Sequence, residues 1–81
     1  MKSIEEKIKR VLIESFAISE EEIKLETKLI NDLDLDSLDF VELIMILEKE
    51  YDICILEDEA YKIKTVGQLI ETINKYVNKE I

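Results

Sequence analysis

Residues 36–51 read DSLDFVELIMILEKEY, and their apolar side chains recur at the spacing of an α-helix. The side chains that share one face of this helix, at about 100° per residue, are Phe40, Leu43, Ile44, Leu47 and Tyr51. Asp36 is the predicted N-cap, because a side-chain oxygen at this position accepts a hydrogen bond from the first turn. The stretch therefore predicts a long central helix with one buried face.

Capping patterns place two further helices. Ser3 with Glu6, and Thr65 with Gln68, are spaced as capping boxes, and apolar residues at helical spacing follow both pairs. The chain has no proline and one glycine, which favours helices over a turn-rich β fold. The predicted helices span about 3–16, 36–51, 57–61 and 65 onward. The predicted fold class is all-α, a bundle of three long helices and one short helix.

Residues 17–36 show no sustained periodicity, which predicts a long first loop. Residues 19–22 suit a short helical turn within it. Loops of this length are uncommon in compact domains and are often functional. We expect the loop to lie on the core through its apolar side chains, which are Ile23, Leu25, Leu29, Ile30 and Leu33.

The composition indicates one small domain, residues 1–81. A single cysteine cannot form an internal disulfide, and the lack of histidine excludes a Cys/His metal site. Cys54 lies between two isoleucines and is expected to be a small core residue. The N-terminus has no apolar run of signal-peptide type, and no stretch reaches the roughly 20 apolar residues of a membrane span. We therefore expect a cytoplasmic protein that does not insert into membranes.

The net charge of −9 is concentrated in the middle of the chain. Residues 31–59 hold eleven acids and one base, Lys49. Such a segment repels nucleic acid and anionic membranes, and it attracts basic protein surfaces at rates that fall with salt. It is either a solvated face that keeps the protein soluble or a recruiting surface. Recruitment is favoured because the acids gather around residue 37 and the helix after it.

The central helix carries a second apolar stripe, formed by Leu38, Val41 and Met45 and edged by Glu42 and Glu48. A helix that is apolar on two sides is, in one interpretation, the most buried helix of the bundle. In the other interpretation the stripe is a docking surface. Docking is favoured because the flanking acids would be costly to bury.

Ser37 is a lone hydroxyl among carboxylates at the start of this helix. It is poorly suited to nucleophilic catalysis, because the chain has no histidine to act as its base and Lys49 lies about three helical turns away. A serine at a helix N-terminus can instead hold a phosphodiester, because free N–H groups and the helix dipole favour negative charge. The position therefore predicts a modified serine rather than a catalytic one.

The alternation of Asp32, Asp34 and Asp36 also matches the first three ligands of an EF-hand loop. The register then fails, since the sixth position is Ser37 rather than glycine and the twelfth is Leu43 rather than glutamate. No dedicated metal site is predicted, although weak divalent-cation binding would relieve the repulsion among these acids. An acidic calcium-binding or helical interaction module is the non-carrier alternative.

Four short motifs resemble those of the bacterial acyl carrier proteins in order and spacing over nearly the whole chain. They are Asp32-Leu33, Asp36-Ser37-Leu38-Asp39, Val41-Glu42-Leu43 and Ile63-Lys64-Thr65-Val66. The resemblance implies a four-helix bundle of acyl-carrier type whose Ser37 receives 4'-phosphopantetheine covalently from coenzyme A, through a separate, magnesium-using phosphopantetheinyl transferase. It further implies a protein without catalytic residues that carries acyl intermediates as thioesters in fatty-acid biosynthesis.

The resemblance also implies a monomer that docks onto basic patches of the transferase and of acyl-processing enzymes. The matching positions are Asp36, Leu38, Asp39, Val41, Glu42, Met45 and Glu48. Members of the family shelter the acyl chain between their helices, and the candidate lining residues here are Phe40, Leu47, Ile55 and Ile63.

Two positions before the serine depart from the family pattern. Asp34 and Leu35 stand where members of fatty-acid synthesis typically have a glycine and a small residue. A common proline after the second helix is replaced around residues 55–56. The alternative carrier role is therefore in a specialised acyl, polyketide or D-alanyl pathway.

Overall fold

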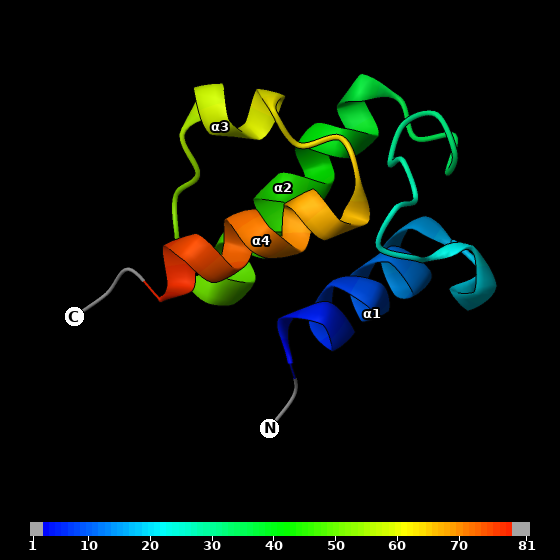
Figure 1. Cartoon of the computed structure of the whole chain (residues 1–81), viewed down its shortest axis with the longest axis horizontal. Coiled ribbons are helices and arrows are strands. Elements are labelled where there is room, and N and C mark those ends of the chain that lie inside the picture. Colours follow the sequence, from blue (N-terminus) through cyan, green and yellow to red (C-terminus); the bar gives the residue numbers. More distant parts are fainter. Residues whose placement is uncertain (1–2, 79–81) are drawn as a thin grey trace.

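The computed structural model describes residues 3–78, which form an all-α fold (Figure 1). The helices are α1 (Ile4–Phe16), α2 (Ser37–Tyr51), α3 (Glu57–Tyr61) and α4 (Val66–Val77), and a 3-10 turn, η1 (Glu20–Glu22), lies in the first loop. The predicted bundle of three long helices and one short helix is confirmed. Each long helix starts one residue after its predicted start, because that residue is the cap. No helix in residues 3–78 is long and apolar enough to cross a membrane.

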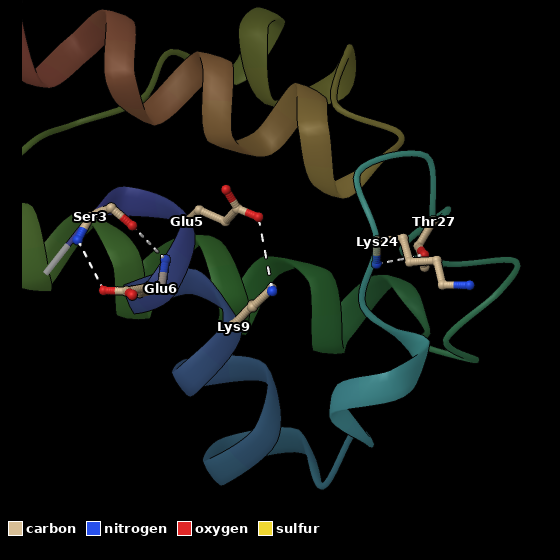
Figure 2. A network of polar contacts seen from close by, with 6 residues as sticks. All are labelled: Ser3, Glu5, Glu6, Lys9, Lys24 and Thr27. Carbon is tan, nitrogen blue, oxygen red and sulfur yellow. Dashed lines mark hydrogen bonds and ion pairs between the residues drawn. The ribbon is translucent and has the colours of Figure 1, made fainter.

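Each long helix begins with a reciprocal capping box. In α1 the Ser3 hydroxyl accepts a hydrogen bond from the Glu6 N–H (3.2 Å), and the Glu6 carboxylate accepts one from the Ser3 N–H (3.4 Å; Figure 2). In α4 the Thr65 hydroxyl and the Gln68 side-chain carbonyl do the same, at 3.1 Å each. These bonds satisfy N–H groups that the first helical turn leaves unpaired, and such a cap contributes about 1 kcal/mol. The local sequence therefore sets where these helices begin.

The core lies where the three long helices meet, and α1 packs against both α2 and α4. The largest fully buried side chains are Ile8, Leu12, Leu29, Leu43, Leu47, Val66, Leu69 and Ile73. Burying a side chain of this size contributes roughly 1.5–3 kcal/mol. The short helix α3 contributes no buried residue and lies on the far side of α2 and α4 from α1 in the view of Figure 1.

The first loop is held by backbone bonds to the segment that leads into α4. The Leu29 N–H donates to the Lys64 carbonyl (2.9 Å), and the Gly67 N–H donates to the Leu25 carbonyl (2.8 Å). A Cβ atom on Gly67 would lie 3.0 Å from that carbonyl oxygen. This close approach explains why the only glycine of the chain stands at the start of α4.

The prediction that five apolar side chains anchor the loop is wrong for two of them. Leu25 is 55% exposed and Ile30 is 48% exposed, whereas the buried three are Ile23, Leu29 and Leu33. A polar residue, Thr27, is buried as well. Its hydroxyl donates to the Glu22 carbonyl (2.8 Å) and accepts from the Lys24 N–H (3.0 Å; Figure 2). Because the loop's own backbone satisfies this hydroxyl, its burial costs little, and apolar periodicity gives no sign of it.

The prediction that Cys54 is a core residue is also wrong, because its side chain is exposed. Cys54 lies in the non-helical link between α2 and α3. Ile55 after it is buried and Ile53 before it is partly buried. Successive side chains of an extended segment point to opposite sides, so the two isoleucines turn inward and leave Cys54 in solvent.

Candidate functional site

Ser37 is the first residue of α2, and its side chain is exposed. The backbone around it is fixed by the third capping box: the Asp36 carboxylate accepts from the Asp39 N–H (2.8 Å), and the Asp39 carboxylate accepts from the Asp36 N–H (3.3 Å). The Ser37 hydroxyl makes no hydrogen bond within residues 3–78. A rigid helix start therefore presents a hydroxyl that is free to react with another molecule.

The residues before Ser37 alternate between the core and the solvent. Leu33 and Leu35 are buried, while Asp32, Asp34 and Asp36 are exposed. Leu35 thus places its bulk in the core rather than beside Ser37. Asp34 adopts a left-handed backbone with φ of 59°, which is a conformation that glycine enters freely and aspartate tolerates. Because Leu33 and Leu35 are buried, they anchor the loop to the core immediately before the exposed Ser37.

The aspartates before α2 are engaged separately. The Asp32 carboxylate accepts from the Lys28 N–H (2.8 Å), and Asp36 caps α2. Within residues 3–78 no three acidic or cysteine side chains are arranged to hold a metal ion. Their local role is to order the loop and the helix start.

A groove of about 500 Å³ opens beside Ser37. It is bounded by loop residues 28–31, by the start of α2, by the end of α3 and by the link to α4. A second hollow of about 240 Å³ lies further along α2 and α3. The two hollows share Phe40, Val41, Ala60 and Tyr61 as lining residues. Together they form a continuous, largely apolar surface that leads away from the serine.

The four predicted lining residues are only partly brought together. Phe40 lines both hollows, Ile63 lines the first and Ile55 lines the second. Leu47 lines neither, because it is fully buried. Its place on α2 belongs to the face that packs into the core, so Leu47 is not part of the surface of these two hollows, and its role in lining a space for an acyl chain stays a prediction. The sequence did not predict that loop residues 28–31 form one wall of the groove. It also did not predict the contribution of Tyr61, which is 69% exposed on α3.

The second apolar stripe of α2 faces the solvent. Leu38 is 77% exposed, Met45 61% and Val41 51%. The interpretation of α2 as a helix buried on both apolar sides is therefore wrong. We call the surface formed by Leu38, Val41 and Met45 the α2 stripe.

The acidic side chains near the α2 stripe differ in their exposure and in the hydrogen bonds that they accept. Asp36 and Glu42 are exposed, whereas Asp39 and Glu48 are partly buried. The Glu48 carboxylate accepts a hydrogen bond from the Ile55 N–H (2.8 Å), so it also holds the link between α2 and α3. Glu42 is consequently the acid beside the middle of the stripe that is most available to a partner.

Two α4 side chains tether α3, the outer wall of the groove. Lys75 forms an ion pair with Glu59 (2.9 Å), and the Leu56 N–H donates to the Tyr76 hydroxyl (3.1 Å). The hydrogen bond to Glu59 and the charge of that carboxylate raise the pKa of Lys75. Because α3 buries no side chain of its own, these tethers help to fix the wall of the groove.

A family model for the phosphopantetheine attachment site matches residues 6–73. Two solved structures are similar over most of their length. An acyl carrier protein from Thermotoga maritima is 27% identical, with a TM-score of 0.81 over 91% of this chain and 86% of that one. A proposed acyl carrier protein from Mycobacterium tuberculosis is 33% identical, with a TM-score of 0.81 over 89% of this chain and 96% of that one. This chain belongs to the acyl carrier protein family.

Membership of the acyl carrier protein family makes the chain a non-catalytic carrier of covalently attached phosphopantetheine. Members interact with a phosphopantetheinyl transferase and with acyl-processing enzymes. The residues described above fit such a group: a free, exposed hydroxyl stands at a helix N-terminus, beside a groove that is apolar along α2. The groove also has two lysines, Lys28 and Lys64, in its lining.

Proposed function

We propose that Ser37 is the attachment point of the phosphopantetheine and that the chain carries acyl groups in fatty-acid biosynthesis. The observation that carries the proposal is the free Ser37 hydroxyl at the capped start of α2, next to an apolar groove. When bound, the group supplies a thiol that holds the acyl cargo as a thioester. The chain's own residues present the Ser37 hydroxyl to the transferase and shelter the attached group.

The Asp36–Asp39 capping box fixes the backbone at Ser37, and within residues 3–78 no side chain is hydrogen-bonded to the Ser37 hydroxyl as a general base would be. The chain has no histidine, and no lysine ammonium group bonds to the hydroxyl within residues 3–78. A transferase must therefore remove the Ser37 proton during loading. This division of labour fits a carrier, because an unactivated hydroxyl does not react before its enzyme docks.

The α2 stripe, with Asp36, Asp39 and Glu42, is the proposed docking face for partner enzymes. Three exposed apolar side chains offer area to bury, and the acids steer basic patches toward Ser37. Glu48 belongs to this face only at its edge, since its carboxylate already accepts from Ile55. We further propose that residues 1–81 are one carrier domain, a monomer of the cytoplasm that does not bind nucleic acid. The exposed, unpaired Cys54 suits such a reducing compartment.

A specialised acyl, polyketide or D-alanyl pathway is the second candidate, and Asp34 favours it. Asp34 is exposed and occupies a left-handed backbone position three residues before Ser37. It adds a negative charge that every partner must accommodate next to the loading site. Partner enzymes matched to this charge would differ from those that serve a carrier with glycine there.

Loading is tested by incubating the apo-protein with coenzyme A, magnesium and a phosphopantetheinyl transferase, and then measuring its intact mass. We expect the wild-type protein and a Ser15→Ala control to gain the full mass of the arm, because Ser15 is an exposed serine on α1 away from the groove. Ser37→Ala should gain nothing. A Ser37→Ala protein that still takes up the arm would refute the assignment. The pathway is tested by purifying the protein from its host and identifying the acyl group released from the thioester.

A further inference from the structure

The lining of the groove beside Ser37 includes two lysines, Lys28 and Lys64, although residues 31–59 are strongly acidic. Lys28 and Lys64 both line the groove that Ser37 lines. Both lysines are exposed, and neither ammonium group has an ion-pair partner within residues 3–78. Lys24, Lys49 and Lys62 are likewise exposed and without an ion pair within residues 3–78, so the feature that sets Lys28 and Lys64 apart is that both line the groove.

The fold brings these two lysines onto neighbouring segments. Lys28 forms an isolated antiparallel bridge with Thr65, and the Leu29 N–H donates to the Lys64 carbonyl (2.9 Å). The Lys64 N–H in turn donates to the Gln68 side chain (2.7 Å), which fixes this segment at the start of α4. Each lysine adds one positive charge to the lining of the groove, and both charges attract an anion in the groove. The groove that Ser37 lines therefore suits a negatively charged group.

We propose that Lys28 and Lys64 bind the phosphate of the arm carried by Ser37 and so direct the arm into the groove. The inference rests on the proposed attachment at Ser37. A phosphodiester on the Ser37 hydroxyl would adjoin the groove of about 500 Å³ that both lysines also line. Asp36 and Asp39 flank Ser37 on the chain and repel the phosphate. The two ammonium groups attract the phosphate toward the walls of the groove that the first loop and the link to α4 form.

This placement gives the groove two parts with different chemistry. The lysines hold the anionic root of the arm, and Phe40, Val41 and Ile63 offer an apolar surface for the remainder of the arm. When the lysines bind the phosphate, the remainder of the arm is directed along this apolar surface. Without the lysines, the nearest charges are the acids at the start of α2, which push the phosphate outward. Lys28 and Lys64 are in this sense positioning residues for the carried group.

The test compares apo and holo forms of three proteins: the wild type, Lys28→Gln/Lys64→Gln, and Lys62→Gln. Lys62 is an exposed lysine at the end of α3 that does not line the groove, so Lys62→Gln is the control for loss of a surface charge outside the groove. Loading of each protein is first confirmed by intact mass. We expect loading to change the melting temperature of the wild type and of Lys62→Gln by the same amount. The holo form of the double variant should lose about 4 °C or more beyond that change at low salt. The extra loss should shrink in about 0.5 M salt, at which charges on the surface are strongly screened.

A second measurement reads the phosphate directly. The ³¹P resonance of holo Lys62→Gln should coincide with that of the holo wild type, whereas in the double variant it should move toward that of free phosphopantetheine. If loading shifts the melting temperature and the ³¹P resonance equally in all three proteins, the lysines do not bind the phosphate and the inference is overturned. Absence of any mass gain would instead overturn the attachment at Ser37, and the inference with it.

A carboxylate on the acyl cargo is the other anion that the two lysines can attract. The two anions are distinguished by loading either a butyryl or a succinyl group, which have equal chain length, because only the succinyl group ends in a carboxylate. We expect the double variant to show its extra loss with the unacylated arm and with both cargoes. A loss that appears only with the succinyl group would mean that the lysines recognise a cargo carboxylate, and it would overturn the assignment to the phosphate.

Discussion

Leu35→Ala tests whether the loop before Ser37 is anchored as the structure indicates. The Leu35 side chain is only 6% exposed, and it precedes the N-cap of α2 directly. Truncating a buried leucine to alanine costs about 2–5 kcal/mol, and the loop around Leu35 can relax, so we expect a loss of roughly 2–3 kcal/mol. A domain of this size is stable by about 4–12 kcal/mol, so the variant should stay folded at 25 °C with a melting temperature lower by about 10–20 °C.

The matched control is Leu25→Ala in the same loop. Leu25 is 55% exposed, so its truncation should change the free energy of unfolding by about 0.5 kcal/mol or less. Both variants are measured by urea denaturation followed by circular dichroism at 222 nm, at one ionic strength. Hydrogen exchange of amides 36–39 should accelerate in Leu35→Ala and not in Leu25→Ala, because only the former frees the start of α2. Equal costs for the two leucines would refute the proposed anchoring.

Four further changes probe other parts of the molecule. Glu42→Lys should slow arm transfer several-fold at low salt and less at high salt, whereas Glu14→Lys on α1 should not; equal rates at low salt would count against the α2 stripe as the docking face. Ala17→Gly should stabilise the protein by about 0.5–1 kcal/mol in thermal unfolding, because Ala17 ends α1 in a left-handed conformation with φ of 56°; a loss of stability would contradict this. Tyr76→Phe should cost about 1 kcal/mol by removing the acceptor of the Leu56 N–H, while Tyr61→Phe, which is exposed, should be neutral in the same assay. Magnesium or moderate salt should raise the melting temperature, since residues 31–59 carry eleven acids and one base; a flat response would show that their repulsion is already balanced.

The parts of the site that the sequence predicted are those that depend on local interactions. The capping box at Asp36 and Asp39 involves residues three apart, so the start of α2 and the exposure of Ser37 could be read directly. The α2 stripe was predicted from helical periodicity, and its exposure confirms that it is separate from the core face. Periodicity does not decide whether such a stripe faces solvent or another helix, because it shows which side chains share a face but not what covers that face.

The wrong predictions concern side chains whose burial depends on contacts between different segments of the fold. Leu25 and Leu29 have the same chemistry in the same loop, yet Leu29 is buried and Leu25 is exposed. The difference arises where the loop is held by backbone bonds to the segment leading into α4, in which the Leu29 N–H donates to Lys64 and the Leu25 carbonyl accepts from Gly67. Cys54 has apolar neighbours on both sides, but the direction of the link to α3 turns it outward. Local composition carries no information about either arrangement.

The sequence by itself determined the helices, their caps, the free serine at the head of α2 and the acidic character of the central segment, because each depends on residues within a few positions of one another. The tertiary structure alone decided the groove, since its walls come from the first loop, α2, α3 and the link to α4. It also decided that Lys28 and Lys64 line the same groove as Ser37. These two lysines are far apart in the chain, and the backbone bonds between the first loop and the link to α4 bring their segments side by side.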